Sequence, residues 1–252
     1  MRAVITYHSI DSSRSAISIS ETEFRRHMEW LASGRVPVVS LETLVAGSAD
    51  SDAIALTFDD AYQNFGRIAA DLLRDHGFPA TLFAVTARVG GTNAWEPSAA
   101  SGSLPVLPLL DWAGIAAAAE AGVTIGSHGR THRHLPALEK QELDDEVSGS
   151  FDDIRRELGL SPTAFCYPYG DATARERGAA ARAYRMAVTT ELRALDDADD
   201  EYMVPRLDAY YLRRPGRLES FGTPAFERYL KVRRRGRSLK SGVGRLLGRG
   251  NE

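Results

Sequence analysis

DAIALTFDD (residues 52–60) is an apolar run that ends in two adjacent carboxylates. A strand that is apolar at nearly every position is buried on both faces, which is typical of a parallel sheet covered by helices. Similar runs recur from AVITYHSI (3–10) to PTAFCYPYG (162–170) and YMVPRLDAYYL (202–212). Seven or eight such strand–helix units predict a distorted (β/α) barrel of about seven strands, with an open doubly wound sheet as the alternative.

Helical patterns lie between the apolar runs. NFGRIAADLLRDHG (64–77) predicts a helix that Gly77 stops, and ALEKQELDDEVSGSFDDIRRELG (137–159) predicts a long acidic helix. VPVVSL (36–41) is predicted to be a further strand.

Composition favours one globular domain with a short extension. Hydrophobic residues make up 43% and charged residues 26% of the 252 residues, which excludes disordered and collagen-like classes. A (β/α) barrel typically takes about 250 residues. We therefore expect a barrel over residues 1–215 and a basic tail over residues 216–252.

The tail carries a charge opposite to that of the body. Residues 231–249 contain eight Lys or Arg and no acidic residue, so the net charge of −3 leaves −11 for the remainder. An acidic body argues against a nucleic-acid partner. Basic residues interspersed with Val and Leu suit contact with an anionic membrane surface, and a solvated tail is the alternative.

Cysteine usage and hydropathy favour a cytoplasmic location. Cys166 is the only cysteine, so no internal disulfide can form. The start, MRAVITYHSIDSS, has no apolar stretch of signal-peptide length, and no run of about 20 apolar residues could span a membrane. We expect a cytoplasmic protein whose tail contacts the inner face of the membrane.

Reactive side chains gather where the predicted strands end. Parallel barrels build their sites at the carboxyl ends of their strands. Accidental placement would spread such residues over both ends, so clustering at one end indicates a functional site. The residues at or just beyond these ends are His8, Asp59, Asp60, His128, Tyr167, Tyr169 and Arg206.

Asp60, His128 and His132 form a candidate metal site. Two adjacent carboxylates are costly unless a cation or a proton separates their roles, although such a pair can also cap a helix. SHGRTH (127–132) places two histidines four residues apart, a spacing that lets both imidazoles reach one ion. Two histidines and one carboxylate leave positions on a divalent ion open for water and substrate.

The chain resembles the polysaccharide deacetylases of the NodB-homology type, carbohydrate esterase family four. FDDAYQNFGRIAADLLRDHGFPATLFAV (58–85) is similar to that family's first motif and the helix and strand that follow it. The stretch 109–135, which contains SHGRTH, is similar to the second motif, and FCYPYG (165–170) to the third. The resemblance extends from about residue 3 to residue 210.

This resemblance implies both a fold and a chemistry. Family members adopt a distorted barrel of about seven strands and hydrolyse acetamides with a divalent metal, which is expected to be zinc. By the resemblance, Asp60 and the two histidines of SHGRTH hold the metal and Asp59 is the general base. The backbone N–H of Tyr169 helps to form the oxyanion hole, and Tyr167 is expected to bind substrate.

The chain departs from the family pattern at several positions. Ala61 replaces the usual glycine after FDD, and Gly129 replaces a Ser or Thr, which predicts a lost hydrogen bond and weaker metal binding. Cys166 stands where many members have an arginine that pairs with the catalytic aspartate. We predict that Arg206 takes over that role through a charge-assisted hydrogen bond. A surface pair between Arg206 and Asp208 is the alternative.

A proton donor is also missing from its usual place. Many members use a C-terminal histidine as the general acid, but no histidine follows His134. His27 and His76 fall on predicted helices, and His134 is expected to face solvent, which leaves His8. Some members that begin with a similar YH motif have circularly permuted motifs, so the resemblance implies that His8, after Tyr7, is the acid. A buried structural histidine is the alternative.

These observations predict a metal-dependent hydrolase that removes N-acetyl groups from amino sugars of a polysaccharide or glycan precursor. A cytoplasmic location favours a nucleotide-linked or lipid-linked precursor over finished cell wall. Two alternatives stay open. One is hydrolysis of another small amide, such as a formamide or cyclic imide, and the other is a non-catalytic glycan-binding barrel.

Overall fold

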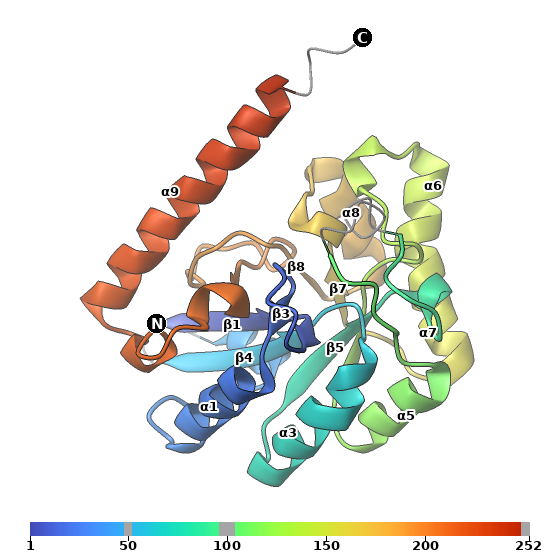
Figure 1. Cartoon of the computed structure of the whole chain (residues 1–252). Helices are drawn as coiled ribbons and strands as arrows, with labels where there is room; N and C mark the ends of the chain where they lie inside the picture. The colour runs from blue at the N-terminus through green and yellow to red at the C-terminus, as the bar shows by residue number, and fades with distance from the viewer. Residues whose placement is uncertain (48–51, 96–103, 248–252) are drawn as a thin grey trace.

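Seven parallel strands form a nearly closed barrel in the computed structural model, which describes residues 1–47, 52–95 and 104–247 (Figure 1). A single parallel bridge between Val188 and Val204 joins the two edges of the sheet. The predicted barrel is therefore confirmed, and the open sheet is excluded. In spatial order the strands are β8 (Met186–Val188), β7 (Ala164–Cys166), β6 (Thr124–Ser127), β5 (Ala80–Ala84), β4 (Ala53–Phe58), β1 (Arg2–Tyr7) and β9 (Arg206–Asp208).

The register of three strands positions the site. β1 pairs with β4 along its whole length, so Tyr7 lies opposite Phe58, and the residues that follow both strands emerge together. β9 pairs with the other edge of β1, with Arg206 opposite Val4. Arg206 therefore starts below the rim, inside the barrel, and its side chain can rise toward the strand ends.

The predicted helices form, with a π-helical turn inside two of them. Phe65–Ala69 is a π-helical turn that continues into α3 (Ala70–His76), and Gly77 ends the helix in the left-handed region at φ 66°. The long acidic helix consists of α6 (Lys140–Asp144), the π-helical turn Asp145–Gly149 and α7 (Ser150–Leu158). The other helices of the barrel are α1 (Glu21–Ala32), α2 (Leu41–Ala46), α5 (Trp112–Glu120) and α8 (Ala174–Ala183).

Two local features differ from the predictions. The strand predicted at VPVVSL is wrong, because this segment makes only one bridge, between Val38 and Ile54. Pro37 has no N–H to donate to a ladder, which limits the pairing. A small parallel sheet of β2 (Ser9–Ile10) and β3 (Ser18–Ile19), not predicted from the sequence, follows β1 and stands beside the rim.

The chain beyond residue 215 packs on the barrel before it leaves it. Leu218, Phe221, Phe226 and Leu230 are buried in the main core cluster. α9 (Pro224–Leu247) begins on this surface and then extends away from the body (Figure 1). The domain boundary at 215 stays a prediction, and residues 248–252 of the tail lie outside the described residues. None of the helices in the described parts of the chain has the length and apolar character of a membrane span.

Candidate active site

A cavity of about 200 Å³ opens at the carboxyl ends of the strands. It brings together residues that are far apart in the sequence, as the alternating pattern predicted. Seven of the predicted site residues line it, and Arg206 lies beneath it. The lining residues are His8, Ile17, Asp59, Asp60, Tyr62, Leu104, His128, His132, Tyr167, Tyr169 and Thr190.

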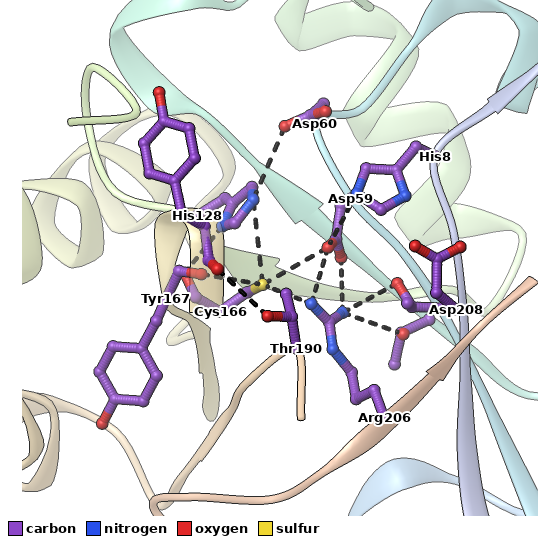
Figure 2. A network of polar contacts seen from close by, with 12 residues as sticks. His8, Asp59, Asp60, His128, Cys166, Tyr167, Thr190, Arg206 and Asp208 are labelled. Carbon is purple, nitrogen blue, oxygen red and sulfur yellow. Dashed lines mark hydrogen bonds and ion pairs between the residues drawn. The ribbon is translucent and has the colours of Figure 1, made fainter. Parts of the chain in front are cut away.

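Asp59 is held by a bidentate ion pair with Arg206. The guanidinium Nη1 donates to Asp59 Oδ1 at 2.7 Å and Nη2 donates to Oδ2 at 2.8 Å (Figure 2). Nη1 also contacts the hydroxyls of Thr6 and Thr57, and Nε donates to the carbonyl of Thr189. Burial alone would raise the pKa of Asp59, but the charge and hydrogen bonds of Arg206 lower this pKa far below its usual range. Asp59 is therefore ionised at physiological pH.

His8 lies on the other side of Asp59 from the metal candidates. Its Nε2 is 3.6 Å from Asp59 Oδ2, and its side chain is 19% exposed, so it reaches the cavity (Figure 2). Tyr7 points the opposite way, into the core, with its hydroxyl 3.1 Å from His27 Nδ1. Successive side chains of a strand alternate in direction, which explains why one residue of the pair is structural and the next lines the site.

Asp60 faces the two histidines of SHGRTH. The Nε2 atoms of His128 and His132 each lie 3.6 Å from Asp60 Oδ1. Among the described residues, no donor makes a hydrogen bond to this buried oxygen. The three ligand atoms lie within 4.8 Å of one another. A buried carboxylate oxygen without a donor, facing two imidazoles, fits a divalent cation.

The orientation of His128 suits a metal ligand. Its Nδ1 donates to the carbonyl of Cys166 at 2.7 Å, which leaves the lone pair of Nε2 directed at Asp60. Burial lowers the pKa of His128 to about 4, an effect that the nearby His132 reinforces, so the imidazole is neutral at neutral pH. The weaker metal binding predicted from Gly129 stays a prediction.

Comparison with known proteins identifies the family. The model of the polysaccharide deacetylase family matches residues 46–188, more than half of the chain. The chain belongs to the polysaccharide deacetylase family. A curated protein of Bacillus subtilis (strain 168), named "Putative polysaccharide deacetylase YxkH", is 26% identical over 210 residues, which cover 81% of this chain and 70% of that protein.

Solved structures show the same fold at low identity. IcaB from Ammonifex degensii is similar with a TM-score of 0.69 and 19% identity, over 90% of this chain and 96% of that chain. The Streptococcus pyogenes deacetylase PplD, solved with acetate, gives a TM-score of 0.68 and 19% identity, over 82% of this chain and 91% of that chain. These likenesses establish that the deacetylase barrel is the fold of this chain.

Backbone strain is concentrated around the cavity. Of the five described non-glycine residues with positive φ, four line or adjoin the cavity: Asp60 (68°), Ala61 (56°), His132 (62°) and Tyr169 (62°). Such conformations cost about 1–3 kcal/mol each and persist where the surroundings enforce them. Ala61 keeps the left-handed conformation in place of the family's usual glycine, so this departure leaves the turn after FDD intact.

Tyr167 lies at the cavity but buries most of its side chain. Its ring is fully buried in the cluster beneath the rim, and its hydroxyl donates to the carbonyl of Tyr202 at 3.0 Å. The prediction that Tyr167 binds substrate stays a prediction, because the tyrosine begins the turn after β7 at the edge of the cavity with its ring buried. Tyr169, two residues later, is 40% exposed and packs its ring edge-on against His132.

The remaining histidines lie where the sequence predicted. His27 is buried on α1, where burial lowers its pKa to about 4, and His76 ends α3. His134 is exposed and contacts Asp171. Sequence reasoning missed four lining residues, Ile17, Tyr62, Leu104 and Thr190, which come from loops and carry no signal in their residue type.

Proposed function

We propose that this protein is a metal-dependent hydrolase that removes N-acetyl groups from amino sugars of a glycan or glycan precursor. One observation carries the proposal. Two adjacent carboxylates share one cavity, and one is fixed by Arg206 while the other faces two histidines. This division separates a group that can accept a proton from a group that can bind a cation. Membership of the polysaccharide deacetylase family supports the choice of an acetylated glycan.

The metal site would consist of Asp60, His128 and His132. Their nitrogen and carboxylate donors suit zinc, which in catalytic sites has three protein ligands and an open position. A bound ion of this kind polarises the amide carbonyl and lowers the pKa of bound water. The backbone N–H of Tyr169 would add a donor for the developing oxyanion, because the turn that it belongs to lines the same cavity.

Asp59 and His8 would move the protons. Asp59 is ionised and fixed in orientation by Arg206, so it can accept the proton that water loses as it attacks the carbonyl carbon. His8, 3.6 Å from Asp59, would donate a proton to the leaving nitrogen as the C–N bond breaks. The products are acetate and a free amine, which balances hydrolysis. The place of the chain in the branch with an N-terminal YH motif stays a prediction.

The test is acetate release from acetylated amino-sugar oligomers. We expect the zinc-loaded full chain to release acetate and free amine in equal amounts, and the chelator-treated chain to release neither until zinc is restored. Asp59→Asn should retain zinc but lose turnover. Zinc binding without turnover on any oligomer would favour the glycan-binding barrel. Turnover on formamides or cyclic imides alone would favour the other amidase.

The basic tail supports a second part of the proposal, contact with anionic lipid. α9 keeps contact with the body as far as Arg234, which lies 3.6 Å from Glu191, and then extends away from it (Figure 1). Val232 is 68% exposed beside consecutive arginines. Each basic residue near an anionic surface contributes roughly 1 kcal/mol. Deletion of residues 231–252 should abolish salt-sensitive sedimentation with phosphatidylserine vesicles and leave turnover of free oligomers unchanged. Equal sedimentation of both proteins would exclude this contact and the expected location at the inner membrane face.

A further inference from the structure

Glu146 is a buried carboxylate outside the cavity that contacts the loop between the two histidines. It is 3% exposed and belongs to the π-helical turn between α6 and α7. Its Oε2 accepts the backbone N–H groups of Arg130 at 2.9 Å and Thr131 at 3.0 Å, and its Oε1 accepts the Thr131 hydroxyl. Three donors from two consecutive residues of SHGRTH thus converge on one side chain. A π-helical turn frequently occurs at a functional site.

Gly129 provides the space that this carboxylate occupies. A Cβ atom at position 129 would lie 2.9 Å from Glu146 Oε2, closer than real Cβ contacts. The backbone there has φ +76°, which also favours glycine. A side chain at position 129 would therefore displace the carboxylate of Glu146 from its place on the loop, so the two residues form one structural unit.

The loop that Glu146 holds sets the distance between two metal ligands. His128 directly follows β6, and His132 sits in the left-handed region at φ 62°. The two intervening N–H groups bound by Glu146 fix the turn that brings both Nε2 atoms to 3.6 Å from Asp60 Oδ1. Without the carboxylate, these buried N–H groups would lose their acceptor and the turn would relax.

We propose that Glu146 is a positioning residue that pre-forms the metal site, an inference that rests on the metal site proposed above. Its carboxylate reaches no predicted ligand side chain and acts through the backbone between them. Because the loop is already ordered, less conformational entropy is lost when the metal binds the two histidines. Partners that orient metal ligands typically contribute 10–100-fold to metal affinity.

Asp153 offers a matched control on the next helix. It is also a buried carboxylate, but it binds the side chains of Arg130 and Thr86, with Nε of Arg130 at 2.9 Å and Oγ1 of Thr86 at 2.7 Å. Asp153→Ala also deprives the side chains of Arg130 and Thr86 of a hydrogen-bond partner. Glu146 nevertheless still accepts the backbone N–H groups of the loop between the two histidines.

The first experiment measures zinc affinity of the metal-stripped full chain by competition with a chromogenic chelator. Glu146→Ala should weaken zinc binding by about 10–100-fold. Glu146→Gln should stay within about threefold, because an amide oxygen can accept the same N–H groups and the Thr131 hydroxyl can reverse its role. Asp153→Ala should also stay within about threefold. Glu146→Asp, which withdraws the carboxylate by one methylene, should fall between the Gln and Ala variants and serves if Glu146→Ala does not fold.

The second experiment measures thermal unfolding without metal. Gly129→Ala should lower the melting temperature in both backgrounds, because φ +76° strains alanine in either, but less in a chain that also carries Glu146→Ala, where the added Cβ no longer meets the carboxylate. An equal decrease in melting temperature in the two backgrounds would show that Gly129 and Glu146 do not form one structural unit. Unchanged zinc affinity of Glu146→Ala, or equal loss in Asp153→Ala, would overturn the positioning role alone. Failure of the natural chain to bind zinc would overturn the metal site and this inference with it.

Discussion

Asp59 and Asp60 are neighbours in the sequence but have opposite surroundings. Both oxygens of Asp59 accept hydrogen bonds from Arg206, whereas Asp60 turns away from Arg206 toward His128 (Figure 2). The positive φ of Asp60, 68°, produces this turn at the strand end. The strain of one residue thus separates two like charges and gives them different partners, which is how a single motif can supply both a base and a ligand.

The two halves of the site also come from different parts of the barrel. We call Asp59, Arg206 and His8 the arginine half, which is built on β4, β9 and the end of β1. We call Asp60, His128 and His132 the histidine half, which lies after β4 and β6. Since they are joined by the turn after β4 and by Cys166, substitutions elsewhere should damage one half and spare the other.

The largest effect is expected in the histidine half. His128→Ala should lose most bound metal and at least about 10²-fold in turnover, because even partners outside the ligand set contribute up to 100-fold. The arginine half should persist, and circular dichroism should be unchanged. Elemental analysis of the purified variant checks the metal. His134→Ala is the control, because the side chain of this exposed histidine pairs with Asp171, which belongs to neither half. Full metal occupancy in His128→Ala would show that the ligand set is wrong.

His8→Ala should damage the arginine half and leave the metal in place. The loss of a positioned acid typically lowers turnover by about 10² to 10⁴-fold. Steady-state kinetics on an acetylated oligomer, with metal content measured in the same sample, tests this expectation. His76→Ala, at the end of α3, should behave as the natural enzyme. If a folded, metal-loaded His8→Ala protein turned over substrate as fast as the natural chain, His8 would have a structural role and would not be the acid.

Arg206→Ala should lower turnover by a smaller factor, about 10–100-fold, because it releases Asp59 without removing it. It should also lower the free energy of unfolding by about 3–5 kcal/mol, since it leaves a buried charge unpaired. Arg206→Met together with Asp59→Asn removes both charges and should recover much of that stability. Urea unfolding checks both values, and an unchanged midpoint in Arg206→Ala would contradict the assignment.

The same pair predicts a pH dependence of stability. An aspartate in the unfolded chain has a pKa of about 3.9, and the pKa of Asp59 in the folded protein lies well below it. The stabilisation is therefore complete above about pH 4 and is lost as the pH falls toward the folded pKa. Urea midpoints measured from pH 7 to pH 3 should fall less steeply in Arg206→Ala than in the natural chain.

Local sequence patterns were enough to predict the barrel, the rim and the histidine half. The alternation of apolar runs and helical patterns predicted the barrel, the polar residues after the apolar runs predicted the rim, and the two histidines four residues apart predicted the histidine half. The pairing of Asp59 with Arg206 was predicted, but the predicted place of Arg206 at the end of a strand was wrong, because Arg206 is the first residue of β9 and reaches Asp59 from below the rim. The buried side chain of Tyr167 was not predicted, because the turn after β7 decides its direction. Glu146 carries no signal of its own, since its contacts depend on how one helix packs on a distant loop.

Cys166 lies where the two halves meet, and its substitution should have the smallest effect. Its carbonyl accepts from His128, but its thiol lies 3.0 Å from Arg206 Nη2 and 3.6 Å from Asp59 Oδ2. With Asp59 and His128 it forms a second group whose ligand atoms could hold an ion. Burial raises the pKa of this thiol well above its usual value. The charge of Arg206 acts to lower this pKa, and the carboxylates of Asp59 and Asp60 act to raise it further. Because the guanidinium of Arg206 already donates to the sulfur of Cys166, we expect the thiol to fill the space between the halves rather than to bind the ion.

Cys166→Ala keeps the carbonyl that orients His128, so metal content and turnover should stay within about threefold of the natural chain. Stability should fall by about 1–2 kcal/mol, from the small cavity that the sulfur leaves. Because the chain has one cysteine, alkylation by iodoacetamide at pH 8 reports on this thiol alone, and it should react only after unfolding. Loss of metal in Cys166→Ala, or protection of a reactive thiol by added zinc, would place the ion in the second group. Asp59 would then be a ligand, and the division between the two aspartates would be wrong.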